Sequence, residues 1–134
     1  MALVVVNNGE SVALQYLVNK ATPENLVLRL FSSNTTPAET DTAATYTESS
    51  FTGYAAATLT GASWGAPVEG APTSISYAQQ TFTCSGASSD TVYGYYMTRV
   101  TTADLILAER DAAAPFSITT SGDNIKITPS ITAD

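Results

Sequence analysis

The strongest pattern of hydrophobic and polar positions lies in two extended runs, residues 92–101 and 105–110, separated by a short polar segment. Both runs are rich in branched and aromatic residues, which fit the pleated, half-buried surface of a sheet. We predict a long hairpin at the centre of a sheet, with its turn around Thr102, Ala103 and Asp104. Gly94 interrupts the first run, and a missing side chain there indicates a bulge or the close approach of another backbone.

The position of this turn also predicts the pairing between the two runs. A buried pair would form at the turn end, and a guanidinium would stack on an aromatic ring at the far end. The expected pairs are Val100 with Leu105, Thr98 with Leu107, and Tyr95 with Arg110.

The N-terminal part begins with an apolar, β-branched run over residues 1–6, which suits either a strand or an arm that docks on a partner. Asn7 followed by Glu10 resembles a capping box and predicts a helix from residue 10 to residue 20, ended by Pro23. Its apolar face would pack over one end or edge of the sheet. That face contains Ala13, Leu14 and Leu17, with Val12 and Tyr16 beside it.

Residues 25–32 are apolar on both faces of an extended chain, which is typical of an interior strand. The following residues, 33–50, are Ser, Thr, Ala and acidic residues with no clear period. A connection of this length in a small domain is usually functional or mobile. We expect it to be mobile or to face a partner.

Further strands are predicted at residues 54–60 and 75–85, and a last hairpin joins 116–120 to 124–128 around Gly122 and Asp123. In that hairpin Ile118 and Ile127 would face inward. Seven or eight short strands at this spacing predict a mainly β fold: one antiparallel β-sandwich or jelly-roll-like domain over residues 1–134, with one short N-terminal helix.

Composition narrows the function classes. Of the 134 residues, 13% are charged, and the net charge of −7 argues against binding to a phosphate backbone. The chain has no histidine, the commonest general base and transition-metal ligand, and its single cysteine excludes an internal disulfide. The first residues have neither the basic flank of a signal peptide nor an apolar run long enough to span a membrane. We therefore expect synthesis in a reducing cytosol, with no nucleic-acid or membrane partner.

Motifs that could carry chemistry have simpler explanations. Residues 61–65, GASWG, match the pattern of a hydrolase nucleophile elbow, but that site needs a histidine, and Pro67 lies where its helix would start. Cys84, close to Phe82 on a predicted strand, suits a small buried hydrophobic residue better than a nucleophile. Tyr93, Tyr95 and Tyr96 cannot form one sugar platform with Trp64, because adjacent residues of a strand point to opposite faces.

Acidic residues are the remaining candidates for catalysis. Paired carboxylates can hydrolyse glycosides without any other group. The acidic residues of this chain lack the regular spacing of a calcium loop. We interpret them as charges scattered on solvated loops. We predict no enzymatic activity, no cofactor and no metal. The candidate carboxylates are those of Asp104, Glu109, Asp111, Glu39, Asp41 and Glu48.

Several stretches of the chain, taken together and in order, resemble a family of small virion structural proteins of tailed bacteriophages, including cyanophages. These stretches are MALVVVNNGE, ATPENLVLRLFSS, SFTGYAAATLTGASW, YAQQTFTCSG, VYGYYMT, LILAERD and SGDNIKITPSI. The resemblance implies a β-rich decoration (cement) protein on the capsid surface of the virion. It also implies a homo-oligomer, a trimer, that binds the major capsid protein, and it supplies no catalytic residues.

Contacts to such a shell would come from the N-terminal run and from the polar connection, by strand addition or by ordering on binding. The first set is Leu3, Val4, Val5 and Val6; the second is Thr36, Glu39, Asp41 and Tyr46. One alternative is a host-binding module at a tail tip or fibre. Another is a small glycan hydrolase that uses carboxylates.

Overall fold

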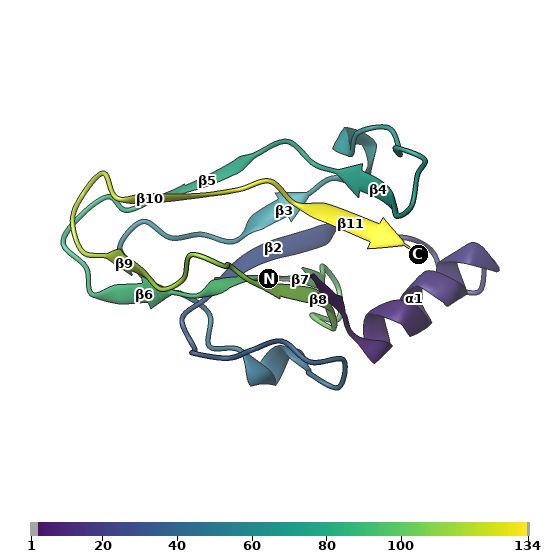
Figure 1. Cartoon of the computed structure of the whole chain (residues 1–134), viewed down its shortest axis with the longest axis horizontal. Coiled ribbons are helices and arrows are strands. Elements are labelled where there is room, and N and C mark those ends of the chain that lie inside the picture. The colour runs from purple at the N-terminus through teal and green to yellow at the C-terminus, as the bar shows by residue number, and fades with distance from the viewer. Residues whose placement is uncertain (1–2, 134) are drawn as a thin grey trace.

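The computed structural model describes residues 3–133. Within them the chain is mainly β, with antiparallel sheets arranged as a sandwich and one α-helix near the N-terminus, so the predicted fold class is confirmed (Figure 1). The helical elements are α1 (Asn7–Leu17) and the 3-10 turns η1 (Ala43–Thr45) and η2 (Gly61–Ser63). The strands are β1 (Val4–Val5), β2 (Leu26–Phe31), β3 (Ala57–Leu59), β4 (Thr73–Ser76), β5 (Gln80–Thr83), β6 (Asp90–Val92), β7 (Gly94–Arg99), β8 (Leu105–Arg110), β9 (Phe116–Ile118), β10 (Asn124–Ile127) and β11 (Ser130–Ala133).

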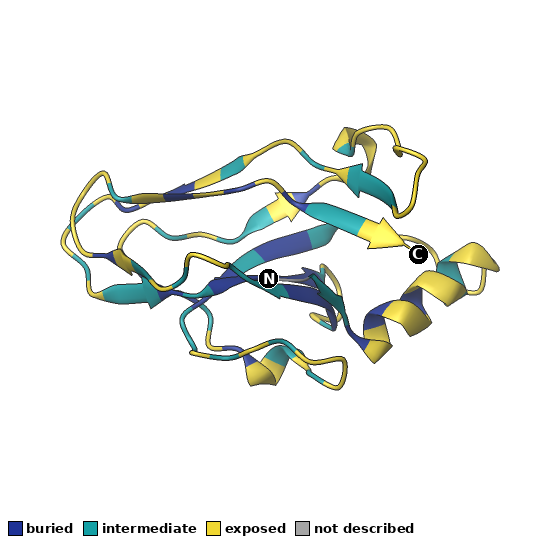
Figure 2. Cartoon of the chain, in the orientation of Figure 1, coloured by how far each residue is buried: buried dark blue, intermediate teal, exposed yellow. Residues whose placement is uncertain are grey.

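The main layer is a five-stranded antiparallel sheet with the order β1-β8-β7-β2-β3. Strand β2 lies between β7 and β3, as its two apolar faces predicted. Leu28 and Leu30 are fully buried on one face, and Phe31 is fully buried on the other. The three strands β2, β7 and β8 form the most buried part of the molecule (Figure 2).

The predicted hairpin exists as β7 and β8, but its predicted register is wrong. Thr98 pairs with Leu105, and Tyr95 pairs with Glu109. The turn is longer than expected: the Arg99 N–H donates to the Asp104 carbonyl at 3.0 Å, which leaves Val100 in the loop and 47% exposed. A bulge between Met97 and Thr98 shifts the register once more.

The prediction for Gly94 is confirmed. A Cβ at this position would lie 2.1 Å from the Glu109 carbonyl oxygen, so only glycine allows the two backbones to approach so closely. Gly94 also pairs with Arg110, whose guanidinium carbon lies 4.9 Å from the centre of the Tyr93 ring. The Arg110 cation therefore stacks on Tyr93, whereas the expected register had placed it on Tyr95.

The second layer consists of the ladders β5–β10 and β4–β11, while β6–β9 lies at one end (Figure 1). The last predicted hairpin does not form, because β9 pairs with β6 and β10 pairs with β5. Ile118 and Ile127 nevertheless point inward, as expected, and join the core between the layers. That core also includes Phe82 and Cys84 of the second layer.

The polar connection over residues 33–50, which we expected to be mobile or to face a partner, packs on the outer face of the five-stranded sheet through one aromatic residue; contact with a partner stays a prediction. This residue, Tyr46, is only 6% exposed and stacks on Tyr96 with ring centres 5.2 Å apart. Phe31 and Val6 belong to the same cluster. One aromatic residue thus anchors a stretch whose composition gave no sign of packing.

Helix α1 lies against β8 through its inner face, which contains Gly9 and Val12. It begins at Asn7 after Val6, with no side-chain cap, so the predicted capping box is wrong. The predicted packing face is also wrong, because Leu14 and Leu17 point away from the sheet. Gly9 explains this choice, because it has no side chain and so lets the helix approach the backbone of β8 closely.

Candidate interaction surfaces

The outward face of α1 is the most exposed apolar feature of the described residues. Leu14, Leu17 and Val18 are 64%, 81% and 69% exposed, respectively. Leu17 and Val18 lie three and four residues after Leu14, so the three side chains share one side of the C-terminal end of α1, where Val18 is the C-cap residue. We call these three residues the outer stripe. Figure 2 shows α1 as largely exposed at one end of the molecule.

An apolar groove lies on the other side of the same helix. Its volume is about 310 Å³, and it runs between α1, the inner edge of the main sheet and the ladder β4–β11. Trp64 forms part of its wall and is held by an edge-on contact with Tyr77, with ring centres 5.3 Å apart. The main side chains around this apolar groove are Val12, Tyr16, Leu26, Trp64, Ile75 and Ile131.

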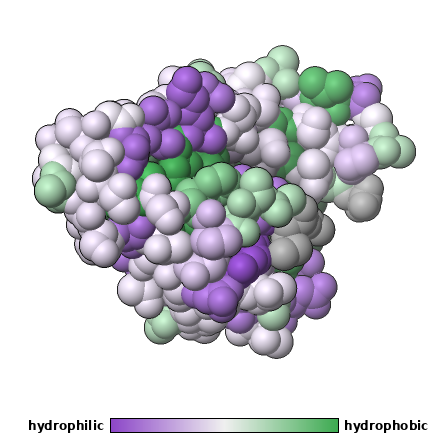
Figure 3. Space-filling view, turned by 60° about the vertical axis from the view of Figure 1, so that its left-hand side comes forward, coloured by the Kyte–Doolittle hydropathy of each residue, from purple (hydrophilic) through white to green (hydrophobic). Residues whose placement is uncertain are grey.

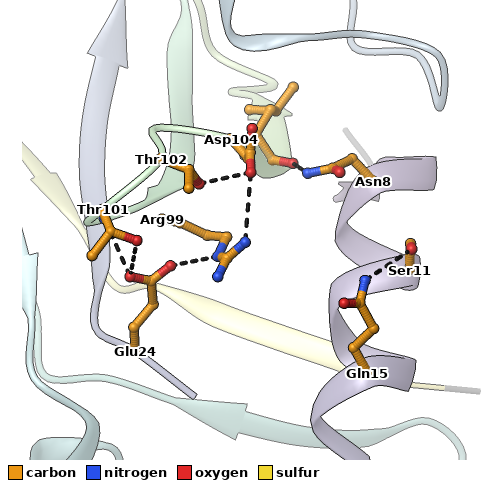
Figure 4. A network of polar contacts seen from close by, with 9 residues as sticks. Asn8, Ser11, Gln15, Glu24, Arg99, Thr101, Thr102 and Asp104 are labelled. Atoms are coloured by element: carbon orange, nitrogen blue, oxygen red, sulfur yellow. Dashed lines mark hydrogen bonds and ion pairs between the residues drawn. The ribbon is translucent and has the colours of Figure 1, made fainter. Parts of the chain in front are cut away.

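A polar network fixes the end of the sheet beside the groove (Figure 4). Glu24, from the segment between α1 and β2, forms an ion pair with Arg99 at the end of β7. The Thr101 hydroxyl donates to the Glu24 carboxylate at 2.6 Å, and this hydrogen bond is the main reason that the pKa of Glu24 is lowered. The network therefore joins the chain after the helix to the turn of the central hairpin.

Near this network the Tyr16 hydroxyl is buried, and no hydrogen-bond partner for it is found among the described residues. Glu24 also contributes to the wall of the apolar groove. The groove is thus apolar along most of its length and has polar atoms near one end. Figure 3 shows, from another side, hydrophobic residues bordered by hydrophilic ones at the surface.

The N-terminal residues predicted to contact a partner occupy the edge of the main sheet. Of the two expectations for this run, a strand or a docking arm, the structure shows a strand: Val4 pairs with Ala108, and Val5 pairs with Leu107. Val6 is fully buried, and its N–H donates to the Ile106 carbonyl. Leu3, Val4 and Val5 are half-buried, Leu3 and Val5 pack against the core, and the open side of β1 is the edge of the sheet. Met1, also part of that run, lies outside the described residues.

The loop residues predicted to contact a partner are not all at the surface. Thr36 and Glu39 are exposed. Tyr46 is a core residue, and its hydroxyl donates to the Asp41 carboxylate at 2.7 Å. Burial and the hydrogen bond to Asp41 raise the pKa of Tyr46. Contact of these residues with a capsid stays a prediction.

Several residues considered for catalysis have structural roles instead. Ser63 ends the 3-10 turn η2, which is not the strand–serine–helix arrangement of a nucleophile elbow. The Glu48 carboxylate forms a salt bridge with Arg29 at 2.9 Å and accepts a hydrogen bond from Tyr54 at 2.9 Å. Cys84 is a buried free thiol, as predicted. Within residues 3–133, no three His, Cys, Asp or Glu side chains gather as a metal site would require.

Sequence reasoning missed the outer stripe and the apolar groove. A signal for both was present, because residues 12–18, VALQYLV, are apolar around almost the whole helix. A helix with this pattern is normally buried on all sides. The sheet covers only one side, which leaves the outer stripe open.

Comparison with known families, curated proteins and solved structures found no match to this chain. No helix in the described residues is both long and apolar enough to cross a membrane. The evidence for function therefore lies in the surfaces of the chain and in the resemblance noted from its sequence.

Proposed function

We propose that this protein is a non-enzymatic structural protein of a tailed-phage virion. In this proposal it is a capsid decoration (cement) protein that binds the lattice of the major capsid protein and stabilises the head. The observation that carries the proposal is the outer stripe, where three large apolar side chains lie exposed at the C-terminal end of one short helix. Contiguous exposed apolar surface of this kind marks protein–protein contact.

The scaffold behind this surface suits a role in binding. Several polar side chains considered for chemistry are engaged in structural contacts, as in the Tyr95 hydroxyl, which donates to Glu109 at 2.6 Å. Burial, together with this hydrogen bond, raises the pKa of Tyr95, so the phenol stays protonated. Such a side chain acts as a structural clamp and not as an acid or base near neutral pH.

A decoration protein acts by repetition. Each contact with the shell can be small, because many copies across a lattice sum their contributions. A rigid sheet that bridges neighbouring capsid subunits would resist the outward pressure of packaged DNA. The trimeric state and the location on the head are implied by the sequence resemblance and are part of the proposal.

Binding to purified empty heads tests the proposal. The full chain is mixed with heads lacking it, the heads are sedimented, and the bound fraction is measured against concentration. Saturable binding with a fixed number of copies per head is expected, and decorated full heads should release their DNA at a higher temperature. An acidic β-protein of similar size serves as the control. Absence of binding at concentrations of tens of micromolar, with the fold intact, would count against the proposal.

A further inference from the structure

We propose that residues 34–46 form a lid on the outer face of the main sheet, which opens as one unit while the rest of the fold stays intact. We call these residues the lid, and Tyr46 is its latch. Opening uncovers an apolar patch of the sheet that includes Val6 and Tyr96. The inference goes beyond the proposed function, and it holds whether or not the chain binds a capsid.

The two ends of the lid are tied together, and this neck holds the ends in place when the lid moves. The Ser32 N–H donates to the Thr47 carbonyl at 2.8 Å, and the Thr47 N–H donates to the Ser33 hydroxyl at 3.2 Å. Directly after the neck, the salt bridge between Glu48 and Arg29 fixes the chain to β2. A surface loop closed at its neck in this way is an Ω-loop, and Figure 1 shows it below the main sheet, with the short turn η1 within it.

The lid makes hydrogen bonds within itself, so it can move as a body. The Asp41 carboxylate accepts hydrogen bonds from the Ala38 N–H at 2.9 Å and from the Tyr46 hydroxyl at 2.7 Å. The Thr42 N–H donates to the Thr45 hydroxyl at 3.1 Å, and the Thr45 N–H donates back to the Thr42 carbonyl at 3.0 Å. The hydroxyl of the latch therefore leaves the sheet together with its partner, and opening does not cost that hydrogen bond.

Two hydrogen bonds among residues 3–133 join the lid to the body of the fold beyond its neck. The Asn7 N–H, at the start of α1, donates to the Glu39 carbonyl at 2.9 Å. The Arg110 guanidinium donates to the Thr35 carbonyl at 3.2 Å. Asn7 is exposed and Arg110 is half-buried, so water can replace both bonds when the lid opens.

The apolar attachment of the lid depends mainly on one aromatic ring. Within the lid, all of which the structure describes, Tyr46 is the one buried residue. Its ring packs against Phe31 and Tyr96, with ring centres 4.9 Å and 5.2 Å away, and Ala43 is partly buried against the same cluster. Segments with few buried apolar contacts open at a lower free energy than the whole fold. We therefore expect the lid to open more often than the sandwich unfolds.

A cleft separates the lid from the turn of the central hairpin. Its volume is about 360 Å³, and it lies between residues 41–44 of the lid and residues 103–105 of the turn. The lid is therefore not packed against the turn, and its movement there requires no rearrangement of the sheet. Opening does break the contact between Glu39 and the first N–H of α1, so the state of the lid is coupled to the start of the helix.

Thiol labelling under native conditions tests the lid. Val6 is fully buried in the cluster that the latch completes, and Cys84 is 1% exposed in the core between the layers. The double variant Val6→Cys, Cys84→Ala reports opening of the lid, whereas Cys84 in the wild type reports opening of the whole fold. The introduced thiol should react faster than Cys84 by about tenfold or more. Its rate should hardly change at low urea concentrations, because opening of the lid exposes little surface.

Two tyrosine substitutions separate the lid from the fold. Tyr46→Ala removes the latch and should speed labelling of the introduced thiol by about tenfold or more. Tyr77→Ala is the matched control, because Tyr77 is a half-buried aromatic residue of the other layer, in contact with Trp64. It weakens the closed and open states equally, so it should speed labelling of Cys84 in the wild-type background and leave the rate of the introduced thiol unchanged.

Hydrogen exchange in the wild type makes the same test without any substitution. The Asn7 amide, which the lid protects, should exchange faster than the neighbouring Val6 amide, which donates to the Ile106 carbonyl within the body. Equal labelling rates of the two thiols, a steep urea dependence for the introduced thiol, or its acceleration by Tyr77→Ala would overturn the inference. If the Val6→Cys chain does not fold, exchange decides, and equal rates for the two amides would overturn it.

Discussion

Replacement of Gly9 by alanine tests how α1 is attached to the sheet. A Cβ added at Gly9 would lie 2.1 Å from the carbonyl oxygen of Ile106 and 2.9 Å from its carbonyl carbon. Real Cβ atoms essentially never approach other atoms closer than 3.0 Å. The oxygen cannot easily move, because it also accepts a hydrogen bond from the Val6 N–H at 3.1 Å.

The expected cost follows from two opposing effects. The helix must move away from β8 by about 1 Å, which disturbs the packing of Val12, and overpacking of this kind costs about 1–3 kcal/mol. We take the upper end because the clash is with backbone. Alanine in place of glycine within a helix returns about 1 kcal/mol. The net loss of unfolding free energy is therefore about 2 kcal/mol for Gly9→Ala, or about 6–8 °C in Tm for a chain of this length.

Thermal and urea unfolding, followed by circular dichroism, measure this loss. Ser11→Ala serves as the helical control, because Ser11 is exposed and the substitution should change the stability by less than about 0.5 kcal/mol. If Gly9→Ala were instead more stable than wild type by about 1 kcal/mol, helix propensity alone would be acting. The close contact between α1 and β8 would then be refuted.

Three further predictions concern titration and reactivity. The pKa of Glu24 is lowered mainly by the hydrogen bond from the Thr101 hydroxyl. The ionised Glu24 therefore stabilises the fold above the ordinary carboxyl pKa, and this stabilisation is lost as the pH falls through the lowered pKa. Glu24→Gln should flatten the acid side of a stability–pH curve, and an unchanged curve would refute this. Burial and the bond to Glu109 raise the pKa of Tyr95, so its contribution to stability is full below pH about 10 and declines above it. Tyr95→Phe should therefore reduce the loss of stability on the alkaline side, and an equally steep loss would contradict the assignment. Cys84 is 1% exposed, so a thiol reagent should label it only after unfolding, and rapid labelling of the native protein would show that the core is open.

Several strands could be predicted from sequence, because burial on one or both faces leaves a periodic pattern, but the single strand predicted over residues 75–85 is two, β4 and β5, and β11 was not predicted. The apolar faces of β2 and the inward direction of Ile118 and Ile127 are examples of such a pattern. Pairing was harder to predict. The register of the central hairpin depends on a longer turn and on a bulge, and Ala103 in that turn adopts a positive φ of 57°, which its residue type does not indicate. We also assumed that strands consecutive along the chain pair with each other, and this assumption was wrong for β9 and β10.

The helix shows why the candidate surfaces could not be found from sequence. Apolar periodicity identified α1, but residues 12–18 offer two apolar faces, and periodicity alone cannot decide which one the sheet covers. Gly9 determines which face packs on the sheet, because it lets the helix approach the backbone of β8, and this contact can be seen only in the structure. Likewise, Tyr46 anchors a polar connection to the sheet, although nothing in the surrounding Ser, Thr and Ala residues indicates packing.

The location of the protein in the virion tests the central claim most directly. Antibodies against the purified chain, carried on gold particles, can be applied to intact phage and viewed by electron microscopy. We predict label distributed over the surface of the head. Label confined to the tail, or absent from particles whose other structural proteins are labelled under the same conditions, would contradict a role in capsid decoration.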